Sequence, residues 1–296
     1  MSRIQHILEK AEREGAALRT SGLGAPPSIA ATMPATIDIA TPPAPARETA
    51  IVPGPGTAES FASVSTPVAT GSELSVRLNP LLVAGLSPKS PAAEQYRQLR
   101  TRLAHTEGAQ NLRSVLVTSP QKGEGKSVTS ANLALTMAQE LHRKVVIVEA
   151  DLRKPSLQYL FGLPPGPGLT DYLAGATDLD SVMCFLPEYQ LTVITAGTSP
   201  ANPAELLGST AMRRMLDQLR TRFDRVILDT PPVLPLADVA VLAPMVDGAL
   251  LVVRAGVTPK PAIENALRAF DTSRLLGVVL NESGMEEDYR YEGPRH

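Results

Sequence analysis

Cysteine, long apolar runs and net charge are all scarce in this sequence of 296 residues. The single cysteine, Cys184, excludes an internal disulfide and favours a reducing compartment. Its neighbours in the run 182–186 are apolar, so we expect a small buried side chain there. No apolar run approaches the roughly 18–20 residues that span a bilayer, and the N-terminal residues lack the apolar core of a signal peptide. We therefore expect a soluble cytoplasmic protein.

The charges are nearly balanced and the histidines are scattered. Lysine and arginine together number 28 against 30 aspartates and glutamates, which leaves a formal net charge of −2. A global basic field is the usual mark of a chain that binds nucleic acid, so we expect no such partner. The 4 histidines show no metal-ligand spacing, and Cys184 has no neighbouring base in the sequence. Neither a histidine metal centre nor a cysteine nucleophile is therefore supported.

Four segments follow one another along the chain. Residues 1–20 place Ile4, Ile7 and Leu8 at helical spacing, which predicts an amphipathic helix. Residues 21–77 are rich in Ala, Pro, Thr and Ser and cannot assemble a core, so we expect a disordered linker. A folded domain is predicted over 78–283 and a flexible tail over 284–296. The terminal helix is either a docking element or a frayed, solvated end.

Patterns of strands and helices alternate within the predicted domain. We expect strands at 113–118, 144–149, 191–195, 225–229, 247–253 and 275–281, and helices at 91–106, 127–142, 209–222, 236–244 and 260–270. Several of these strands are continuously apolar, which is typical of parallel strands buried on both faces. The sequence therefore predicts an α/β fold, a doubly wound and mostly parallel sheet flanked by helices, with ligands at the carboxyl ends of its strands.

A glycine-bearing loop between the first strand and the following helix carries the clearest chemical signal. Glycines let a backbone approach phosphates closely, and amides at a helix N-terminus point at anionic oxygens. In such a loop, Lys126 reaches the β- and γ-phosphates and the Ser127 hydroxyl ligates Mg²⁺. Pro120 replaces the first glycine of the usual motif G-x-x-x-x-G-K-[ST]. We predict that a nucleotide is bound by Gln121, Lys122, Gly123, Glu124, Gly125, Lys126, Ser127 and Val128.

Three carboxylates stand at the ends of predicted strands. Glu149 and Asp151 are two residues apart in an extended segment. Alternate residues of such a segment project to the same side, so we expect both carboxylates on one side. They could hold Mg²⁺, directly or through water, or accept a proton from an attacking hydroxyl. Asp229 ends an apolar strand, which is the Walker B arrangement that positions a metal. With Lys126, these three acids form the predicted catalytic group.

Over roughly residues 85–296 the sequence resembles the bacterial P-loop tyrosine kinases, or BY-kinases, of capsule and exopolysaccharide synthesis. Residues 145–153 are similar to the Walker A′ motif of that family, and residues 197–207 to a further recurring segment. Glu94, Arg97 and Arg100 match its E-x-x-R-x-x-R assembly motif. Residues three and six apart lie on neighbouring helical turns, so one helix face would offer ion pairs to a next subunit. The resemblance implies a stand-alone member with a P-loop NTPase architecture of the MinD/ParA type.

The resemblance also implies a mechanism with ATP and Mg²⁺ as cofactors. A tail tyrosine from a neighbouring subunit of a ring, Tyr289 or Tyr291, would attack the γ-phosphate, with a Walker A′ carboxylate as base. Phosphorylation would add charge and disfavour the packed ring, and cycles of assembly would regulate polysaccharide polymerisation or export. The implied partners are a phosphotyrosine phosphatase and a separate inner-membrane chain-length regulator, a polysaccharide co-polymerase, that activates the kinase. Phosphates and metal would be arranged by Lys126, Ser127, Asp151 and Asp229.

The sequence departs from the family pattern at three places. Glu149 stands where an Asp is usual, which moves the carboxylate by roughly 1.5 Å and lowers the expected rate. Lys122 occupies a position often held by proline, and we expect it to be solvated. The tail holds only Tyr289 and Tyr291. The remaining tyrosines fall in the folded region and are expected to be packing residues: Tyr96, Tyr159, Tyr172 and Tyr189.

Two other functions stay open. One is a deviant-Walker ATPase that partitions cargo or positions the division site, although its signature lysine would stand at Gln121 rather than Lys122. The helix that carries Glu94 and the tail tyrosines would have no role in such an ATPase. The other is a nucleotide-binding scaffold that assembles the export machinery but transfers phosphate poorly, as Glu149 and the sparse tail allow. The function predicted from the sequence is a tyrosine autokinase of exopolysaccharide production.

Overall fold

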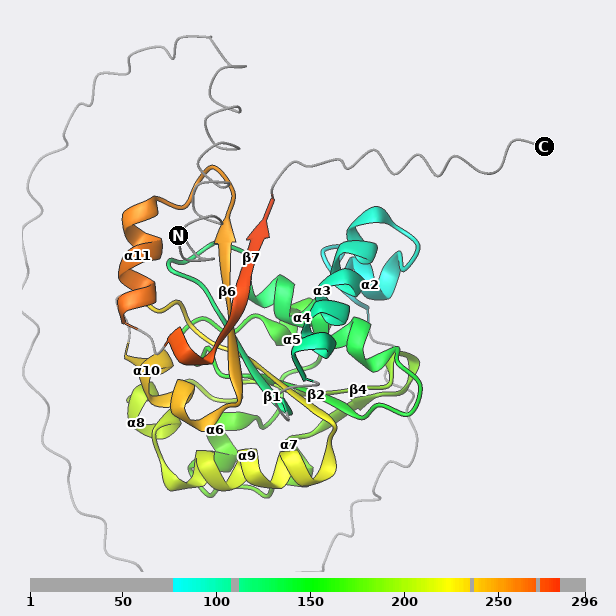
Figure 1. Ribbon diagram of the computed structural model, residues 1–296. Coiled ribbons are helices and arrows are strands. Elements are labelled where there is room, and N and C mark those ends of the chain that lie inside the picture. Colours follow the sequence, from blue (N-terminus) through cyan, green and yellow to red (C-terminus); the bar gives the residue numbers. More distant parts are fainter. Residues whose placement is uncertain (1–76, 108–111, 235–236, 270–271, 283–296) are drawn as a thin grey trace, which may run out of the picture. The chain divides into compact units, whose positions relative to one another are not determined.

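The computed structural model describes residues 77–107, 112–234, 237–269 and 272–282. The predicted N-terminal helix and linker lie outside these residues, and so does the tail with Tyr289 and Tyr291. In the described part of the chain, the strands form one 7-stranded sheet in the order β3-β4-β2-β5-β1-β6-β7 (Figure 1). Neighbouring strands are parallel except for the pair β3 and β4. The predicted doubly wound, mostly parallel α/β fold is therefore confirmed.

The elements follow the predicted alternation of strands and helices. The strands are β1 (Ser114–Thr118), β2 (Val145–Glu149), β3 (Cys184–Leu186), β4 (Leu191–Ile194), β5 (Arg225–Asp229), β6 (Gly248–Arg254) and β7 (Leu275–Asn281). The longer helices are α3 (Pro91–Glu107), α4 (Lys126–Ala138), α9 (Thr210–Arg222) and α11 (Lys260–Arg268). The short helices are α2 (Val83–Leu86), α5 (Leu157–Leu160), α6 (Leu169–Leu173), α7 (Leu179–Val182), α8 (Pro203–Leu207) and α10 (Asp238–Leu242). Single 3₁₀ turns form η1 (Pro187–Tyr189), η2 (Ala243–Met245) and η3 (Thr272–Arg274).

The central strands are apolar throughout because helices cover both faces of the sheet. Alternate residues of a strand point to opposite faces. On β1, Leu116 packs with the helices α6 to α11 on one face, whereas Val115 and Val117 pack with α2, α4 and α5 on the other. The same alternation holds along β2, where Val146 and Ile147 belong to different core clusters. Two cores therefore hold the sheet in place, and its carboxyl-terminal edge is left for the loops.

Several elements differ from the sequence prediction. Helix α4 ends at Ala138 rather than at 142, and His142 adopts a left-handed φ of 61° in the turn before β2. Helix α10 is shorter than the predicted 236–244. Strand β3 and the helices α5 to α8 were not predicted, because each has only 3 to 5 residues. A helix of this length has fewer than two turns, and a strand of this length has about one alternation of side chains. Neither is long enough for its period to be recognised in the sequence.

Two expectations about single side chains were wrong. Cys184 is half-buried rather than fully buried, because it lies on β3 at the edge of the sheet. Burial still raises the pKa of its thiol. Tyr159 is 74% exposed on α5 and fills no core position. The other three tyrosines that were expected to pack, Tyr96, Tyr172 and Tyr189, are half-buried.

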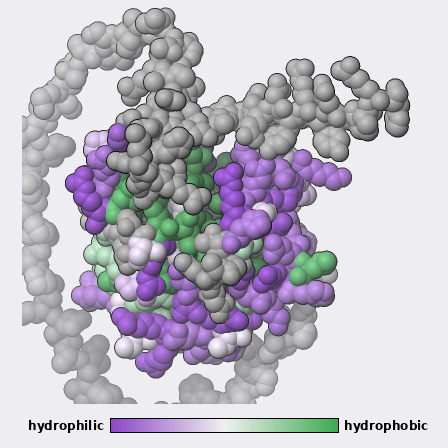
Figure 2. Space-filling model, viewed as in Figure 1, coloured by the Kyte–Doolittle hydropathy of each residue, from purple (hydrophilic) through white to green (hydrophobic). Residues whose placement is uncertain are grey.

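On the face seen in Figure 2, most of the coloured surface is hydrophilic and an apolar band is also visible. Figure 2 shows hydrophobic residues over β6 and the edge strand β7, between flanking hydrophilic regions. Every residue of β7 is half-buried, as expected for a strand with one unpaired edge. None of the helices in the described residues is both long enough and apolar enough to cross a membrane.

The packing of α4 predicts that two leucines of this region differ greatly in how much they contribute to the free energy of unfolding. Leu133 is fully buried beneath the sheet, whereas Leu141, just beyond the helix, is 88% exposed. We expect Leu133→Ala to lower the free energy of unfolding by about 2–5 kcal/mol, because it leaves a cavity in the core. Leu141→Ala is the matched control and should change it by less than about 0.5 kcal/mol. Urea unfolding of both variants would measure the difference, and equal losses would contradict this packing.

Candidate active site

The phosphate loop connects β1 to α4 at the carboxyl edge of the sheet. Gly123 and Gly125 adopt left-handed φ values of 85° and 87°, which favour glycine. A Cβ atom on Gly125 would also lie 2.1 Å from Asn281 Nδ2, so the loop has no room for a side chain there. Helix α4 begins at Lys126, and no side chain caps its first amides. These amides are therefore free to bind an anion.

Lys126 lies among the carboxylates that the sequence placed at strand ends. Its Nζ atom is 2.7 Å from Asp151 Oδ2 and 3.8 Å from Asp229 Oδ2, and it also donates to Ser127 Oγ at 3.1 Å. Burial acts to lower the pKa of Lys126, but the charges of Asp229 and Asp151 outweigh burial and raise it. The side chain is only 11% exposed. Lys126 is therefore held as a buried cation at the mouth of the loop.

Asp229 has the chemistry of an indirect metal ligand. It is fully buried at the end of β5, and neither carboxylate oxygen has a hydrogen-bond partner among the described residues. Burial raises its pKa, and the charge of Lys126 opposes that shift. A buried carboxylate that accepts no hydrogen bond is costly, so a metal cation or its water shell would stabilise it in addition to the 3.8 Å contact with Lys126. The neighbouring Ser127 hydroxyl would supply the direct ligand that Mg²⁺ takes in such loops.

The described residues contain no group of three or more His, Cys, Asp or Glu side chains that could hold a metal ion. Magnesium at a phosphate site would not need such a group. Mg²⁺ there keeps several waters and takes one or two protein oxygens together with the phosphates. Ser127 and Asp229 are the two residues that fit this role.

Glu149 and Asp151 have different partners, although both belong to the predicted Walker A′ pair. Glu149 Oε2 accepts hydrogen bonds from the amides of Ser156 at 2.8 Å and Leu157 at 2.5 Å, at the start of α5. Its Oε1 atom is buried without a partner. Burial and the charge of Asp229 raise the pKa of Glu149 well above its usual range, against the effect of the two amides. Glu149 therefore holds the start of α5, and of these two carboxylates only that of Asp151 contacts Lys126.

A second network, which the sequence reasoning missed, holds the loop from its other side. Glu124 is buried, and its carboxylate accepts from the Gln121 amide at 2.8 Å and from Thr258 Oγ1 at 2.6 Å. Its backbone carbonyl accepts from Asn281 Nδ2 at 3.0 Å. Thr258 follows β6 and Asn281 ends β7, so the last strand of the sheet and the segment after its neighbour both contribute to the loop. A polar residue directly after the apolar run 275–280 was the available signal for Asn281.

Arg153 is a further link that the sequence did not assign. Its Nε and Nη2 atoms donate to the two oxygens of Asp238 at 2.7 and 3.2 Å. Asp238 is fully buried at the start of α10. A bidentate Arg–carboxylate pair fixes orientation as well as distance. The segment that carries Asp151 is therefore attached to α10 on one side and to α5, through Glu149, on the other.

The predicted assembly motif makes contacts within its own chain. Arg97 pairs with Glu94 at 2.7 Å and donates to the Pro88 carbonyl at 2.6 Å. Arg100 lies 3.0 Å from Glu140 and donates to the Thr136 carbonyl at 2.7 Å, which attaches α3 to the end of α4. The remaining predicted loop residues differ in exposure: Gln121 and Lys122 are exposed, as expected for Lys122, and Val128 is half-buried.

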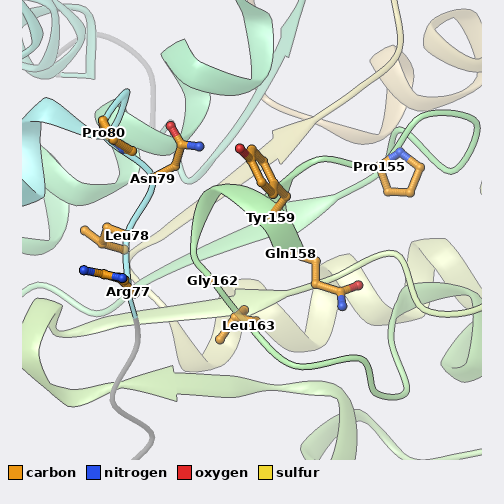
Figure 3. Close-up of a pocket in the computed structure, with 9 residues that line it drawn as sticks. All are labelled: Arg77, Leu78, Asn79, Pro80, Pro155, Gln158, Tyr159, Gly162 and Leu163. Carbon is orange, nitrogen blue, oxygen red and sulfur yellow. The ribbon is translucent and has the colours of Figure 1, made fainter.

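A pocket of about 840 Å³ lies beside the Walker A′ segment rather than at the phosphate loop (Figure 3). It separates the segment that begins at Arg77 from α5, and Figure 3 shows Asn79 and Tyr159 pointing toward one another across it. A backbone hydrogen bond joins the two segments, in which Asn79 N donates to Leu160 O at 2.8 Å. The pocket contains none of the predicted site residues, so we do not assign the nucleotide to it.

A parallel sheet whose first strand leads through a glycine loop and Lys-Ser into a helix, with an acid ending the neighbouring strand, defines a P-loop nucleotide-binding domain. No protein-family model matches the sequence. The chain is 38% identical over 223 residues to the tyrosine-protein kinase YwqD of Bacillus subtilis, which is 74% of this chain and 94% of that protein. It is 32% identical over 216 residues to the putative tyrosine-protein kinase CapB of Staphylococcus aureus, covering 72% and 94%.

Solved structures agree with these relatives. The chimerical protein CapA2B2 matches with a TM-score of 0.65 at 32% identity, over 69% of this chain and 91% of that one. The kinase domain of the Escherichia coli tyrosine kinase ETK matches with a TM-score of 0.65 at 33% identity, covering 68% and 79%. The chain therefore belongs to the bacterial tyrosine-protein kinases of capsule and exopolysaccharide systems. The resemblance drawn from its motifs is confirmed.

The second network predicts that residues far from the phosphate contacts set nucleotide affinity. Thr258→Val removes the hydroxyl that binds Glu124 and leaves a buried carboxylate oxygen without its partner. A lost hydrogen bond is worth about 1 kcal/mol, so we expect the Kd for nucleotide to rise about fivefold. Asn281→Ala should weaken binding similarly. Thr221→Val, at an exposed threonine on α9, is the matched control. Calorimetric titration that gave one Kd for all three variants and the wild type would contradict the network.

Because the pKa of Glu149 is raised in the folded chain, we expect its contribution to the free energy of unfolding to fall as the pH rises. Its pKa is raised in the folded chain, so the folded state binds this proton more tightly than the unfolded state. The stabilising contribution is complete below the unfolded pKa of about 4.3 and is lost as the pH rises toward the folded pKa. Glu149→Gln cannot ionise. Between about pH 4.5 and 7, its free energy of unfolding should therefore fall less than that of the wild type. Parallel pH profiles in urea unfolding would rule this out.

Proposed function

We propose that this protein is an ATP- and Mg²⁺-dependent tyrosine autokinase that phosphorylates its own tail and thereby regulates exopolysaccharide polymerisation or export. The observation that carries the proposal is the contact of Lys126 with Asp151 and Asp229, which brings three strand ends together at the phosphate loop. Bound ATP would supply the phosphoryl group, and Mg²⁺ held by Ser127 and Asp229 would supply positive charge beside it. Family membership supports tyrosine as the acceptor.

Each site residue has a distinct part in this proposal. The amides of the loop and the ammonium of Lys126 hold the phosphates, and Ser127 and Asp229 hold the metal. Asp151 is the carboxylate that would accept the proton of the tyrosine hydroxyl, because Glu149 is already committed to the amides of α5. Phosphoryl transfer depends mainly on positioning and charge stabilisation, so this set of groups is sufficient.

The acceptors and partners are proposed from the sequence. Tyr289 and Tyr291 lie in the tail, beyond the described residues. Glu94 and the two arginines of its motif would mediate a ring in which one subunit's tail enters the next active site. A separate inner-membrane chain-length regulator would activate the kinase and hold it at the cytoplasmic side of the membrane. A phosphotyrosine phosphatase would reset the tail. We also propose that the chain is divided as its sequence suggests, into a terminal helix (1–20), a linker (21–77), the kinase domain (78–283) and a tail (284–296).

The test is mass spectrometry of the C-terminal peptide after incubation of the full chain with Mg-ATP. We expect phosphate on Tyr289 or Tyr291, and none in Lys126→Ala, because that variant loses the ammonium group that contacts both Asp151 and Asp229. Asp151→Asn should slow phosphorylation by about 10²–10⁴-fold through loss of the base. Lys144→Ala, at an exposed lysine, is the matched control.

The same experiment is run with and without the cytoplasmic tail of a candidate membrane partner. An unmodified tail under both conditions, in a protein that binds ATP, would overturn the autokinase proposal and favour a nucleotide-binding scaffold. Steady ATP hydrolysis with nucleotide-dependent dimers and no phosphotyrosine would point to a partitioning ATPase instead.

A further inference from the structure

The outermost strand of the sheet, β7, has one face that is covered only in part. On the side of the sheet that carries Val117, helix α4 packs against β1, β2 and β5, and the strands β6 and β7 continue the sheet beyond β1. Leu276 and Val279 of β7 lie on this side, and both are half-buried. Figure 2 shows hydrophobic residues over β6 and β7. Apolar surface that collects at one place on a domain usually marks a site where another element packs.

Gly277 makes a hollow in this face. It pairs with Leu250 of β6, which belongs to the same core as Leu276 and Val279, so position 277 faces the same side. A Cβ atom on Gly277 would meet no atom within 4 Å beyond the adjoining residues, and its φ is not in the left-handed region that favours glycine. The strand itself therefore does not require a glycine here. Leu276, Gly277 and Val279 together are called the outer face below.

The chain supplies an apolar segment of matching length outside the described residues. Ile4, Ile7 and Leu8 recur at helical spacing, and Leu18 continues the same stripe. In a helix, the roughly 14 residue steps from Ile4 to Leu18 would extend about 21 Å. The 7 residues of β7 extend about 23 Å. The acidic tail 284–296 has no such stripe, so it does not suit an apolar face.

The predicted linker is long enough to bring this segment to the outer face. About 56 residues separate it from Arg77, and a flexible chain of that length has a root-mean-square span of about 40–45 Å. A domain of about 200 residues has a radius of gyration of about 17 Å and hence a diameter of about 45 Å. Every face of the domain is therefore within reach. A tether whose span matches the distance keeps the effective concentration of the segment high, which favours it over a separate chain.

We propose that residues 1–20 form a helix that packs its apolar stripe on the outer face of β7 and so supports the phosphate loop. The support follows from Asn281, which ends β7 and donates to the Glu124 carbonyl at 3.0 Å. A helix packed on β7 holds this strand against β6 and keeps the Asn281 side chain at the loop. The inference adds an intramolecular docking site to the proposed function and does not depend on phosphoryl transfer to tyrosine.

Hydrogen exchange of the full chain without nucleotide tests the helix side of this contact. Mass spectrometry follows the peptide that covers 275–281, and titration calorimetry measures the nucleotide Kd. The helix variant places three glutamates in the apolar stripe: Ile4→Glu, Ile7→Glu and Leu8→Glu. Its matched control places three glutamates on the opposite side of the predicted helix: Gln5→Glu, His6→Glu and Ala16→Glu.

A second variant tests the strand side. Gly277→Glu places a charge in the hollow, where a Cβ atom meets no other atom, so the domain itself is not disturbed. Gly166→Glu is the matched control, because Gly166 is exposed and a Cβ atom there would also meet nothing within 4 Å. The helix variant and Gly277→Glu are also combined in one chain.

We expect the helix variant and Gly277→Glu each to speed exchange over 275–281 by about tenfold or more, because the burial of one apolar side chain contributes about such a factor. The nucleotide Kd should rise by up to about fivefold, as for loss of the Asn281 bond. The combined variant should show no larger effect than either change alone, since both remove one contact. Both controls should behave as the wild type does.

Equal exchange over 275–281 in the helix variant and the wild type would overturn the inference. An effect of Gly277→Glu without an effect of the helix variant would exclude the N-terminal segment as the occupant. Exchange in the wild type that becomes faster on dilution would assign the outer face to a second copy of the chain instead. Tail phosphorylation is not a readout here, so a failure of the autokinase function would be a separate result.

Discussion

The contact of Lys126 with Asp151 and Asp229 is the interaction on which the site depends. Two carboxylates and a lysine are removed from water here, and such burial is costly unless the charges compensate one another. Parallel pairing makes the contact possible, because it places Glu149 opposite Asp229 and Asp229 opposite Val117 at the same edge of the sheet. Moving one strand by a single residue would separate these groups and reverse the direction of every side chain on it.

The balance of charge at this edge also explains why a divalent cation belongs in the proposed reaction. One lysine faces three acids, two of which have raised pKa values. A nucleotide adds several negative charges to a region that already has an excess. Helix amides contribute only partial positive charge. A metal ion at Ser127 and Asp229 would supply the missing positive charge, and the oxygens of Asp229, which accept no hydrogen bond, are suited to its water shell.

The sequence predicted those parts of the molecule that local patterns determine. Continuous apolar runs gave the central strands, and the loop with Lys126 and Ser127 was recognisable because its chemistry requires adjacent residues. The acids at the ends of β2 and β5 were found for the same reason. Contacts between distant segments could not be predicted in this way. Thr258 and Asn281 reach Glu124 across more than a hundred residues of sequence, and no local pattern marks such a pair.

Side-chain exposure was also beyond local reasoning. Tyr159 was expected to pack because it lies within the domain, yet α5 has only 4 residues and turns this ring outward. Glu149 shows a subtler difference. Its position at a strand end was predicted correctly, but its hydrogen bonds go to the amides of α5, which was not itself predicted. The role of a carboxylate depends on the nearest donors, and these were seven and eight residues further along.

The bond between Asn281 and the phosphate loop has a consequence for synthesis of the chain on the ribosome. The loop is made early in the domain, but the residue that holds its Glu124 carbonyl ends the last strand. At ~5–20 residues per second, translation needs on the order of ten seconds or more to travel from one to the other. During that interval the nascent loop lacks one of its supports. The phosphate loop therefore gains its last support only when β7, the final strand of the kinase domain, has been made.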